Sequence, residues 1–135
     1  MTFGRYLLLA LPLAAFTLPA TAWADGTAIM DAFKSPGQTA IITTKGGEGV
    51  PCYDSVNNLN TAEDAGANHD TFGFNDVTDH HAVFLHAGEH VRVIDNSSDA
   101  PGGAVRLRIE SGADAGTGCW VAGYTENVVK DIRSP

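Results

Sequence analysis

The second half of the chain alternates between apolar and polar residues with the period of two that is typical of β-strands. Segments with this pattern lie at His81–His86, Val91–Asp95 and Val105–Ile109, and Cys119–Ala122 is a further short strand. Gly88 falls in a short connection that predicts a tight hairpin turn between the first two segments. Because alternate residues of a strand share one face, the pattern predicts one core made of Val83, Leu85, Val91, Val93, Val105, Leu107, Ile109 and Val121.

The N-terminal part of the pattern is less regular. The β-branched run Thr39–Thr44 predicts the first strand. Thr27–Phe33 has the length of one or two helical turns, which Pro36 would end, and Thr125–Val129 is compatible with a final helical turn. Strands at short intervals with glycine-rich turns predict an all-β fold, a small barrel of five or six strands.

Residues 45–79 form an enlarged loop after the first predicted strand. Ser55 is a suitable N-cap for a short helix in which Val56 and Leu59 face inward. Residues 67–79 are expected to be a polar loop that holds Phe72 and Phe74. If the enlarged loop packs over the barrel, these two rings can line a groove.

The N-terminus has the three parts of a secretory signal peptide. Arg5 supplies the positive charge, Leu7–Leu18 is the apolar region, and Ala22-Trp23-Ala24 is a small-x-small cleavage site. We therefore expect a signal peptide at 1–24, a lead-in segment at 25–38 and the barrel domain at 39–135. The apolar run is shorter than a membrane span, and no second one follows. The mature protein is expected to be periplasmic or secreted, without an integral membrane segment.

The charge balance narrows the class of partner. The chain has 16 acidic residues against 8 lysines and arginines, a net charge of −8. Phosphate backbones and anionic lipids repel such a chain on average. We therefore expect neither a nucleic-acid partner nor a membrane-surface role.

The chain has two cysteines, Cys52 and Cys119. An even number of cysteines in an exported protein favours a disulfide bond. Two free buried thiols are the alternative. Neither cysteine belongs to a C-x-x-C pair, so the spacing gives no redox motif.

Two parts of the second half resemble the bacterial SH3-like domains of exported proteins. Ala82–Leu85, Gly88 and Val91–Ile94 resemble the "leucine, glycine, V-x-V-L" hairpin of that family. Val105–Leu107 and Gly118–Val121 resemble its closing "V-R … G-x-G-W-V" pair of strands. The resemblance implies a five- or six-stranded SH3-like barrel that binds cell-wall or protein ligands and is not catalytic. Because the family's "L-N-V-R-x-G-P" segment is absent, the ligand class is not carried over.

Several exposed side chains are candidates for ligand contacts. Phe72, Phe74 and Trp120 can line the groove under the enlarged loop. Arg106 and Arg108 lie on the polar face of their strand and can form a small patch for a carboxylate or an acidic partner. The alternative for these arginines is cross-strand pairing with surface acids.

The five histidines suggest a metal site as an alternative function. His86 and His90 flank the Gly88 turn and can be cross-strand neighbours, with Glu89 as a third ligand. Structural zinc needs four ligands and catalytic zinc three, and the cysteines are expected to bond to each other.

The sequence therefore predicts an exported, non-enzymatic binding module for a cell-envelope or extracellular protein or glycan ligand, with no cofactor. A periplasmic metal-binding protein that uses the hairpin histidines is one alternative. A small hydrolase or hydrolase inhibitor is another, although the chain has no G-x-S-x-G nucleophile elbow.

Overall fold

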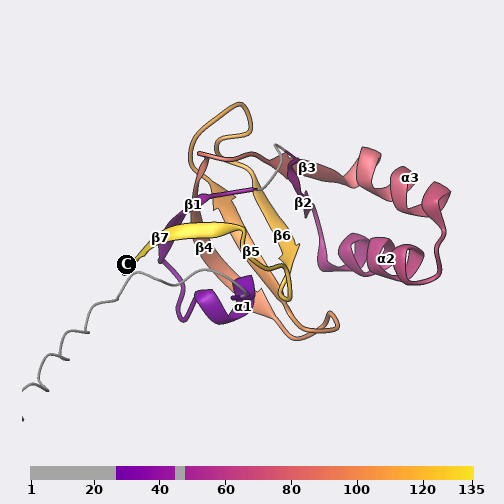
Figure 1. Cartoon of the computed structure of the whole chain (residues 1–135), viewed down its shortest axis with the longest axis horizontal. Helices are drawn as coiled ribbons and strands as arrows, with labels where there is room; N and C mark the ends of the chain where they lie inside the picture. Colours follow the sequence, from indigo (N-terminus) through magenta and orange to yellow (C-terminus); the bar gives the residue numbers. More distant parts are fainter. Residues whose placement is uncertain (1–26, 45–47) are drawn as a thin grey trace, which may run out of the picture.

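The computed structural model describes residues 27–44 and 48–135, so the expected signal peptide lies outside the described residues. These residues form one antiparallel sheet and three helices (Figure 1). The strands are β1 (Thr39–Ile42), β2 (Val50–Tyr53), β3 (Ala82–Leu85), β4 (His90–Ser97), β5 (Ala104–Ile109), β6 (Gly118–Ala122) and β7 (Val129–Arg133). The helices are α1 (Ile29–Ala32), α2 (Val56–Ala67) and α3 (Thr71–His81).

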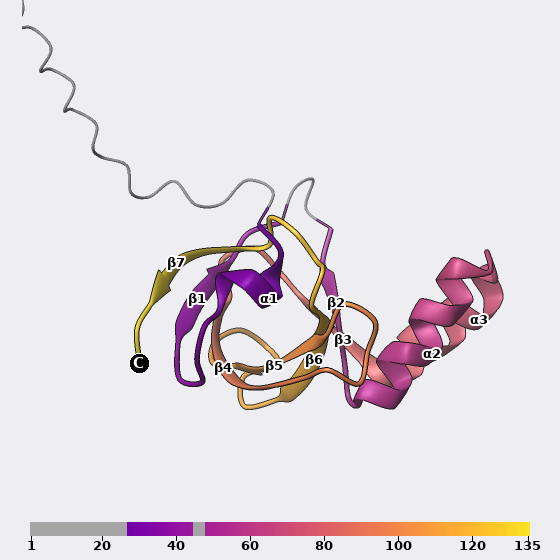
Figure 2. The same ribbon diagram turned by 90° about the horizontal axis from the view of Figure 1, so that it is seen from below.

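The sheet has seven strands in the order β3-β2-β6-β5-β4-β1-β7, and it is not closed. The expected mostly β fold is present, but a five- or six-stranded closed barrel is not. The additional strand β2 lies within the expected enlarged loop. The final helical turn expected at Thr125–Val129 is wrong, because residues 125–128 are not helical and β7 begins at Val129. Figure 2 shows the sheet curled around an interior, with α1 across one end.

The turn around Gly88 does not join a hairpin, which corrects the expectation from the sequence. β3 pairs with β2, whereas β4 lies between β5 and β1. Gly88 does occupy a turn, with φ +92°. Its N–H donates to the carbonyl of Ile42 at 2.8 Å, and the N–H of Ile42 donates to the carbonyl of Glu89 at 2.8 Å. The turn is therefore held by β1, and the chain crosses between distant parts of the sheet.

The predicted core is confirmed. All eight predicted residues belong to one apolar cluster on the inner face of the sheet, with Val83 partly buried and the other seven buried. Leu107, at the centre of β5, is completely buried. Ile29 and Phe33 from the expected lead-in segment belong to the same cluster. Residues 27–33 therefore pack as part of the domain.

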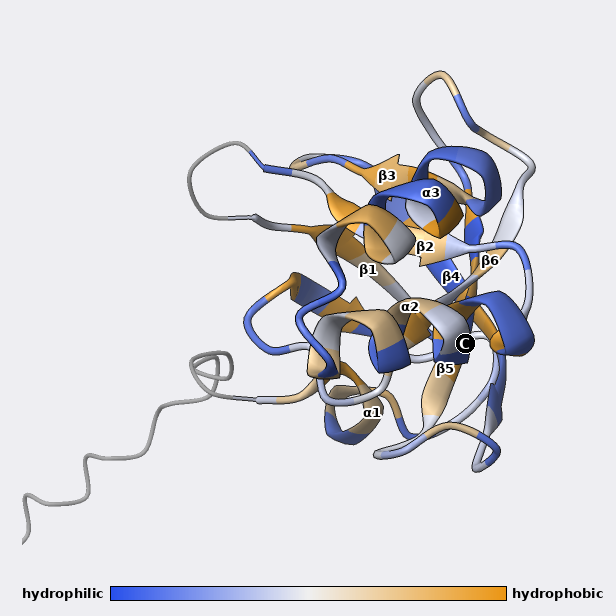
Figure 3. Ribbon diagram, turned by 90° about the vertical axis from the view of Figure 1, so that its right-hand side faces the viewer, coloured by the Kyte–Doolittle hydropathy of each residue, from blue (hydrophilic) through white to orange (hydrophobic). Residues whose placement is uncertain are grey.

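Helices α2 and α3 form a hairpin that projects from the sheet, here called the helical arm (Figures 1 and 3). α2 begins as predicted, because Ser55 Oγ accepts a hydrogen bond from the backbone N–H of Asn58 at 3.0 Å. Leu59 is completely buried on the inward face of α2. No helix among the described residues is long and apolar enough to span a bilayer.

The expected polar loop at 67–79 is wrong, because α3 occupies most of it. Asp70 caps this helix by accepting a hydrogen bond from the backbone N–H of Gly73 at 2.9 Å. Phe74 and Val77, one turn apart, pack against a second apolar cluster. Glycine and asparagine residues lower the helix propensity of the segment, so packing and the cap stabilise α3.

The second apolar cluster lies between the base of the helical arm and the outer face of β5 and β6. Its buried members are Tyr53, Leu59, Ala62, Ala100, Ala104 and Ala122. Polar contacts fasten the arm at its base. The Tyr53 hydroxyl hydrogen-bonds Thr78 Oγ1 at 2.9 Å, and the Tyr124 hydroxyl donates to the Glu63 carboxylate.

Candidate functional site

The predicted disulfide bond between Cys52 and Cys119 is present, with a Cα–Cα distance of 5.3 Å. It joins β2 to β6 beside their single register pair, Tyr53 and Trp120. The backbone contact between these two strands is therefore short, and the covalent bond reinforces it. Both sulfur atoms are committed to the bond, so neither cysteine is a thiolate nucleophile or a metal ligand.

A cavity of about 180 Å³ lies next to the disulfide bond, between the start of β6 and the junction of α3 with β3. The bonded cysteines line it together with polar side chains and short backbone segments. Its lining residues are Cys52, Asp54, His80, His81, Ala82, Val83, Thr117, Gly118 and Cys119. The cavity is therefore small, and it has two imidazoles and one carboxylate at its wall.

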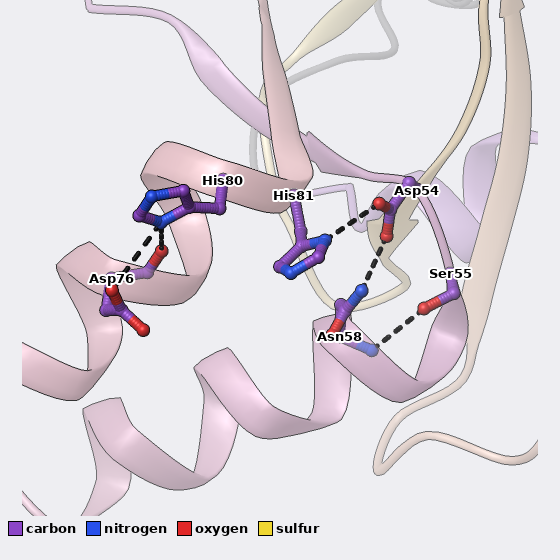
Figure 4. Close-up of polar contacts among 6 residues, drawn as sticks. All are labelled: Asp54, Ser55, Asn58, Asp76, His80 and His81. Atoms are coloured by element: carbon purple, nitrogen blue, oxygen red, sulfur yellow. Dashed lines mark hydrogen bonds and ion pairs between the residues drawn. The ribbon is translucent and has the colours of Figure 1, made fainter.

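Asp54 and His81 form a pair at this cavity (Figure 4). His81 Nδ1 lies 3.0 Å from Asp54 Oδ2, and the backbone N–H of Asp54 donates to the carbonyl of His81 at 2.9 Å. Asn58 Nδ2 donates to Asp54 Oδ1 at 2.7 Å. Hydrogen bonds from Asn58 and then from His81 lower the pKa of Asp54. The carboxylate thus orients the imidazole, as in sites where a histidine binds or exchanges a proton.

His80 and His81 belong to the last turn of α3. The sequence pattern had predicted that His81 begins a strand, and this is wrong. His80 Nδ1 lies 2.7 Å from the carbonyl oxygen of Asp76 and 3.5 Å from its Oδ1. Figure 4 shows the two rings on different sides of the helix. The second imidazole therefore does not complete a cluster around Asp54.

The structure does not bring His86, Glu89 and His90 together as the alternative metal site. His86 Cε1 would lie 3.3 Å from a Cβ added to Gly49, which places this ring near the start of β2. Glu89 Oε1 accepts a hydrogen bond from the backbone N–H of His86. His90 lines a different hollow, between β4, β1 and β7. Within residues 27–44 and 48–135, no three His, Cys, Asp or Glu side chains gather with metal-binding geometry.

Trp120 and Arg106 form a cation–π pair on the outer face of the sheet. They are register partners on β6 and β5, and Arg106 Cζ lies 6.0 Å from the indole centroid. Trp120 is half-buried because one part of it packs against the second apolar cluster. A Cβ added to Gly118 would lie 3.4 Å from Arg106 Nη2. Gly118 also lines the cavity at the disulfide bond, so Arg106 lies beside the rim of that cavity.

The remaining sequence-predicted ligand residues are only partly brought together. Phe74 packs against the same cluster as Trp120, whereas Phe72 is 84% exposed on α3. Arg108 is exposed on the outer face of β5, where its register partners are Arg92 and Gly118. Phe74 and Trp120 thus pack against one cluster at the edge where the arm meets the sheet, and Arg106 lies over the indole there, whereas Phe72 is not part of this cluster.

Sequence reasoning missed the pair of Asp54 and His81. The two residues are 27 positions apart, and the α3 helix that brings them together was expected to be a loop. The only local signal is the position of Asp54, immediately before the Ser55 cap.

Comparisons of the chain with protein-family models, with curated proteins and with solved structures found no match.

Proposed function

We propose that the chain is an exported, non-enzymatic, SH3-like binding module for a cell-envelope or extracellular protein or glycan ligand. The ligand contacts Trp120 and Arg106, and part of it enters the cavity beside the disulfide bond. The observation that carries the proposal is the exposed guanidinium over a half-exposed indole at the rim of a cavity. Tryptophan and arginine are the residue types that most often dominate binding energy at interfaces.

The topology supports the SH3-like part of the proposal. β4, β5 and β6 are consecutive strands that pair with their neighbours, and β1 lies next to β4. The segment between β1 and this meander contains β2, the helical arm and β3, which is the place of the enlarged first loop. The disulfide bond, together with the absence of a membrane-spanning helix among the described residues, is compatible with a periplasmic or extracellular protein.

The chemistry of the cavity favours binding over catalysis. Cys52 and Cys119 are bonded to each other, and the Thr117 hydroxyl, which also lines the cavity, has no hydrogen bond to His81. Asp54 and His81 could orient a proton, but nucleophilic catalysis also needs an activated nucleophile within hydrogen-bonding reach of the imidazole. The pair is better suited to binding than to catalysis, because it can exchange hydrogen bonds with polar groups of a ligand.

The proposal can be tested by affinity capture on the immobilised mature protein. Solubilised envelope proteins and a purified cell-wall fraction from the native host would be applied separately. W120L keeps apolar packing against the arm but removes the indole, and R106Q removes the guanidinium. We expect each variant to lose at least about tenfold in retained ligand, while K34Q, at an exposed site away from this edge, binds like the parent protein.

Normal retention by both W120L and R106Q would contradict the proposed contact site. Failure of the parent protein to retain any component from either fraction would contradict the binding-module function itself. Thermal unfolding of each variant shows whether a loss of binding reflects a loss of the fold.

A further inference from the structure

Positive charge is concentrated on one face of the molecule. Five of the eight lysines and arginines of the chain lie on the outer face of β4, β5 and β7, although the chain as a whole is acidic. They are Arg92, Arg106, Arg108, Lys130 and Arg133. All five side chains are exposed. The strand register places them on the face of the sheet that points away from the buried core. The outer face of the sheet is here called the basic face.

Three of these arginines belong to one row that crosses the sheet. Arg108 pairs in register with Arg92, Arg92 pairs with Thr39, and Thr39 pairs with Arg133. Neighbouring strands are about 4.8 Å apart, so the row from β5 to β7 is about 14 Å long. Like charges directly opposite one another destabilise a sheet. The arrangement therefore has a cost for the isolated protein, which an anionic ligand would remove.

Intramolecular pairing satisfies only part of this charge. Arg92 Nε lies 3.1 Å from Glu110 Oε1, and its Nη1 donates to the carbonyl of Gly37 at 3.1 Å. The side chains of Arg108, Lys130 and Arg133 have no hydrogen bond or ion pair with another described residue. Acidic groups also occur here: Asp95 is the register partner of Arg106, and Asp131 lies between Lys130 and Arg133.

A hollow of about 210 Å³ lies at the β7 end of the arginine row. Thr39, His90, Asp131 and Arg133 line it with polar groups, and Ala40 and Ile41 complete the wall. The register of β1 with β7 shifts between Thr39 and Ile41, and Asp131 has φ +52° at this irregularity. Aspartate adopts this left-handed conformation more readily than most residues, so it can shape the wall of the hollow without severe strain.

The acidic residues that dominate the net charge lie largely elsewhere. The segment 54–81, which contains the helical arm, has no lysine or arginine. Its acidic residues are Asp54, Glu63, Asp64, Asp70, Asp76 and Asp79. The net charge of the chain therefore conceals two regions of opposite sign.

We propose that the basic face binds an anionic glycan with carboxylate-bearing repeating units. The chain of the glycan lies along the row of Arg108, Arg92 and Arg133, whose guanidinium groups bind carboxylates. One sugar unit occupies the hollow, where Thr39, His90 and Asp131 bind its hydroxyl groups. This polar lining suits a sugar better than an apolar peptide side chain. Arg106 belongs to both the basic face and the rim at Trp120, but the proposed glycan contacts do not include it. The inference therefore does not depend on the function proposed for that rim.

The test uses the folded mature protein and three defined polymers. Polygalacturonate is the carboxylate-bearing glycan, dextran is a neutral glycan, and poly-L-glutamate is an acidic polypeptide. Binding is measured by calorimetry at 50 mM and 200 mM NaCl. R108Q, R133Q and the matched control K34Q each remove one exposed positive charge. We expect R108Q and R133Q each to weaken polygalacturonate binding about fivefold, and K34Q to change it less than twofold.

Four outcomes would overturn the inference. The first is that the parent protein does not bind polygalacturonate at 50 mM NaCl, and the second is that it binds dextran equally well. The third is that poly-L-glutamate binds as tightly as polygalacturonate, which would identify an acidic protein as the partner instead. Equal losses in K34Q and R108Q would show that only the net charge matters. Circular dichroism confirms that each variant is folded.

Discussion

The disulfide bond is the feature whose removal gives the sharpest prediction for the fold. It closes a loop of 67 residues, for which the chain-entropy model gives about 4 kcal/mol of stabilisation at 25 °C. A domain of this size has a total free energy of unfolding of about 5–15 kcal/mol. Urea unfolding with and without dithiothreitol should therefore show a large decrease in the midpoint, about 2 M if the urea dependence is about 2 kcal/mol per M.

The structure also predicts where the loss is concentrated. β2 meets β6 at the single register pair Tyr53 and Trp120, whereas β5 pairs with β4 and β6 along most of its length. Hydrogen exchange should therefore accelerate most in β2, β3 and the helical arm after reduction. The C52A–C119A double variant controls for effects of the reductant. A destabilisation below about 1 kcal/mol, or a uniform increase in exchange, would refute this reasoning.

Three further predictions concern single side chains. Leu107→Ala should lower the free energy of unfolding by about 2–5 kcal/mol, because Leu107 is completely buried in the main cluster, and urea unfolding measures this. The lowered pKa of Asp54 stabilises the fold above the usual pKa of the carboxyl, and this contribution disappears as the pH falls through the folded-state pKa. The stability difference between the parent protein and Asp54→Asn should therefore shrink between about pH 5 and pH 2, as measured by urea unfolding. Burial and the hydrogen bond to Glu63 raise the pKa of Tyr124 to about 12, so stability should fall as the pH rises from about 10 to 12, and Tyr124→Phe should reduce this loss.

The sequence predicted those features that depend on local periodicity or on composition. Alternation along β5 identified Leu107 and Ile109 as core residues, because side-chain direction in a strand has a period of two. The pairing of Cys52 with Cys119 followed from the presence of only two cysteines in a chain that its sequence predicts to be exported. The Ser55 cap was visible because a cap is a local motif.

Features that depend on which strands are neighbours were not predictable in the same way. Alternation at 82–85 and 91–95 identified two strands, but the hydrogen bonds of Ile42 hold the turn between them and direct β4 to β1. For the same reason the pair of Asp54 and His81 was missed, since it forms only when β2 and α3 meet. Periodicity specifies the face of a strand, while the pairing partner depends on contacts that are distant in the sequence.

The basic face shows why net charge is a poor guide to the partners of this protein. A charge of −8 predicts a net repulsion of approaching anions, which is strongest at low ionic strength. At physiological ionic strength, however, exposed charges interact over only about 8 Å, so a bound ligand responds to the nearest side chains. Arg108, Arg92 and Arg133 lie in one row, and the acidic helical arm projects away from the strands (Figure 1). The long-range field therefore slows the approach of an anion without determining its affinity at the sheet. Added salt weakens both the repulsion by the distant acidic residues and the attraction to the nearby arginines. If these two effects are separate, the association rate constant should fall less steeply with salt concentration than the affinity does.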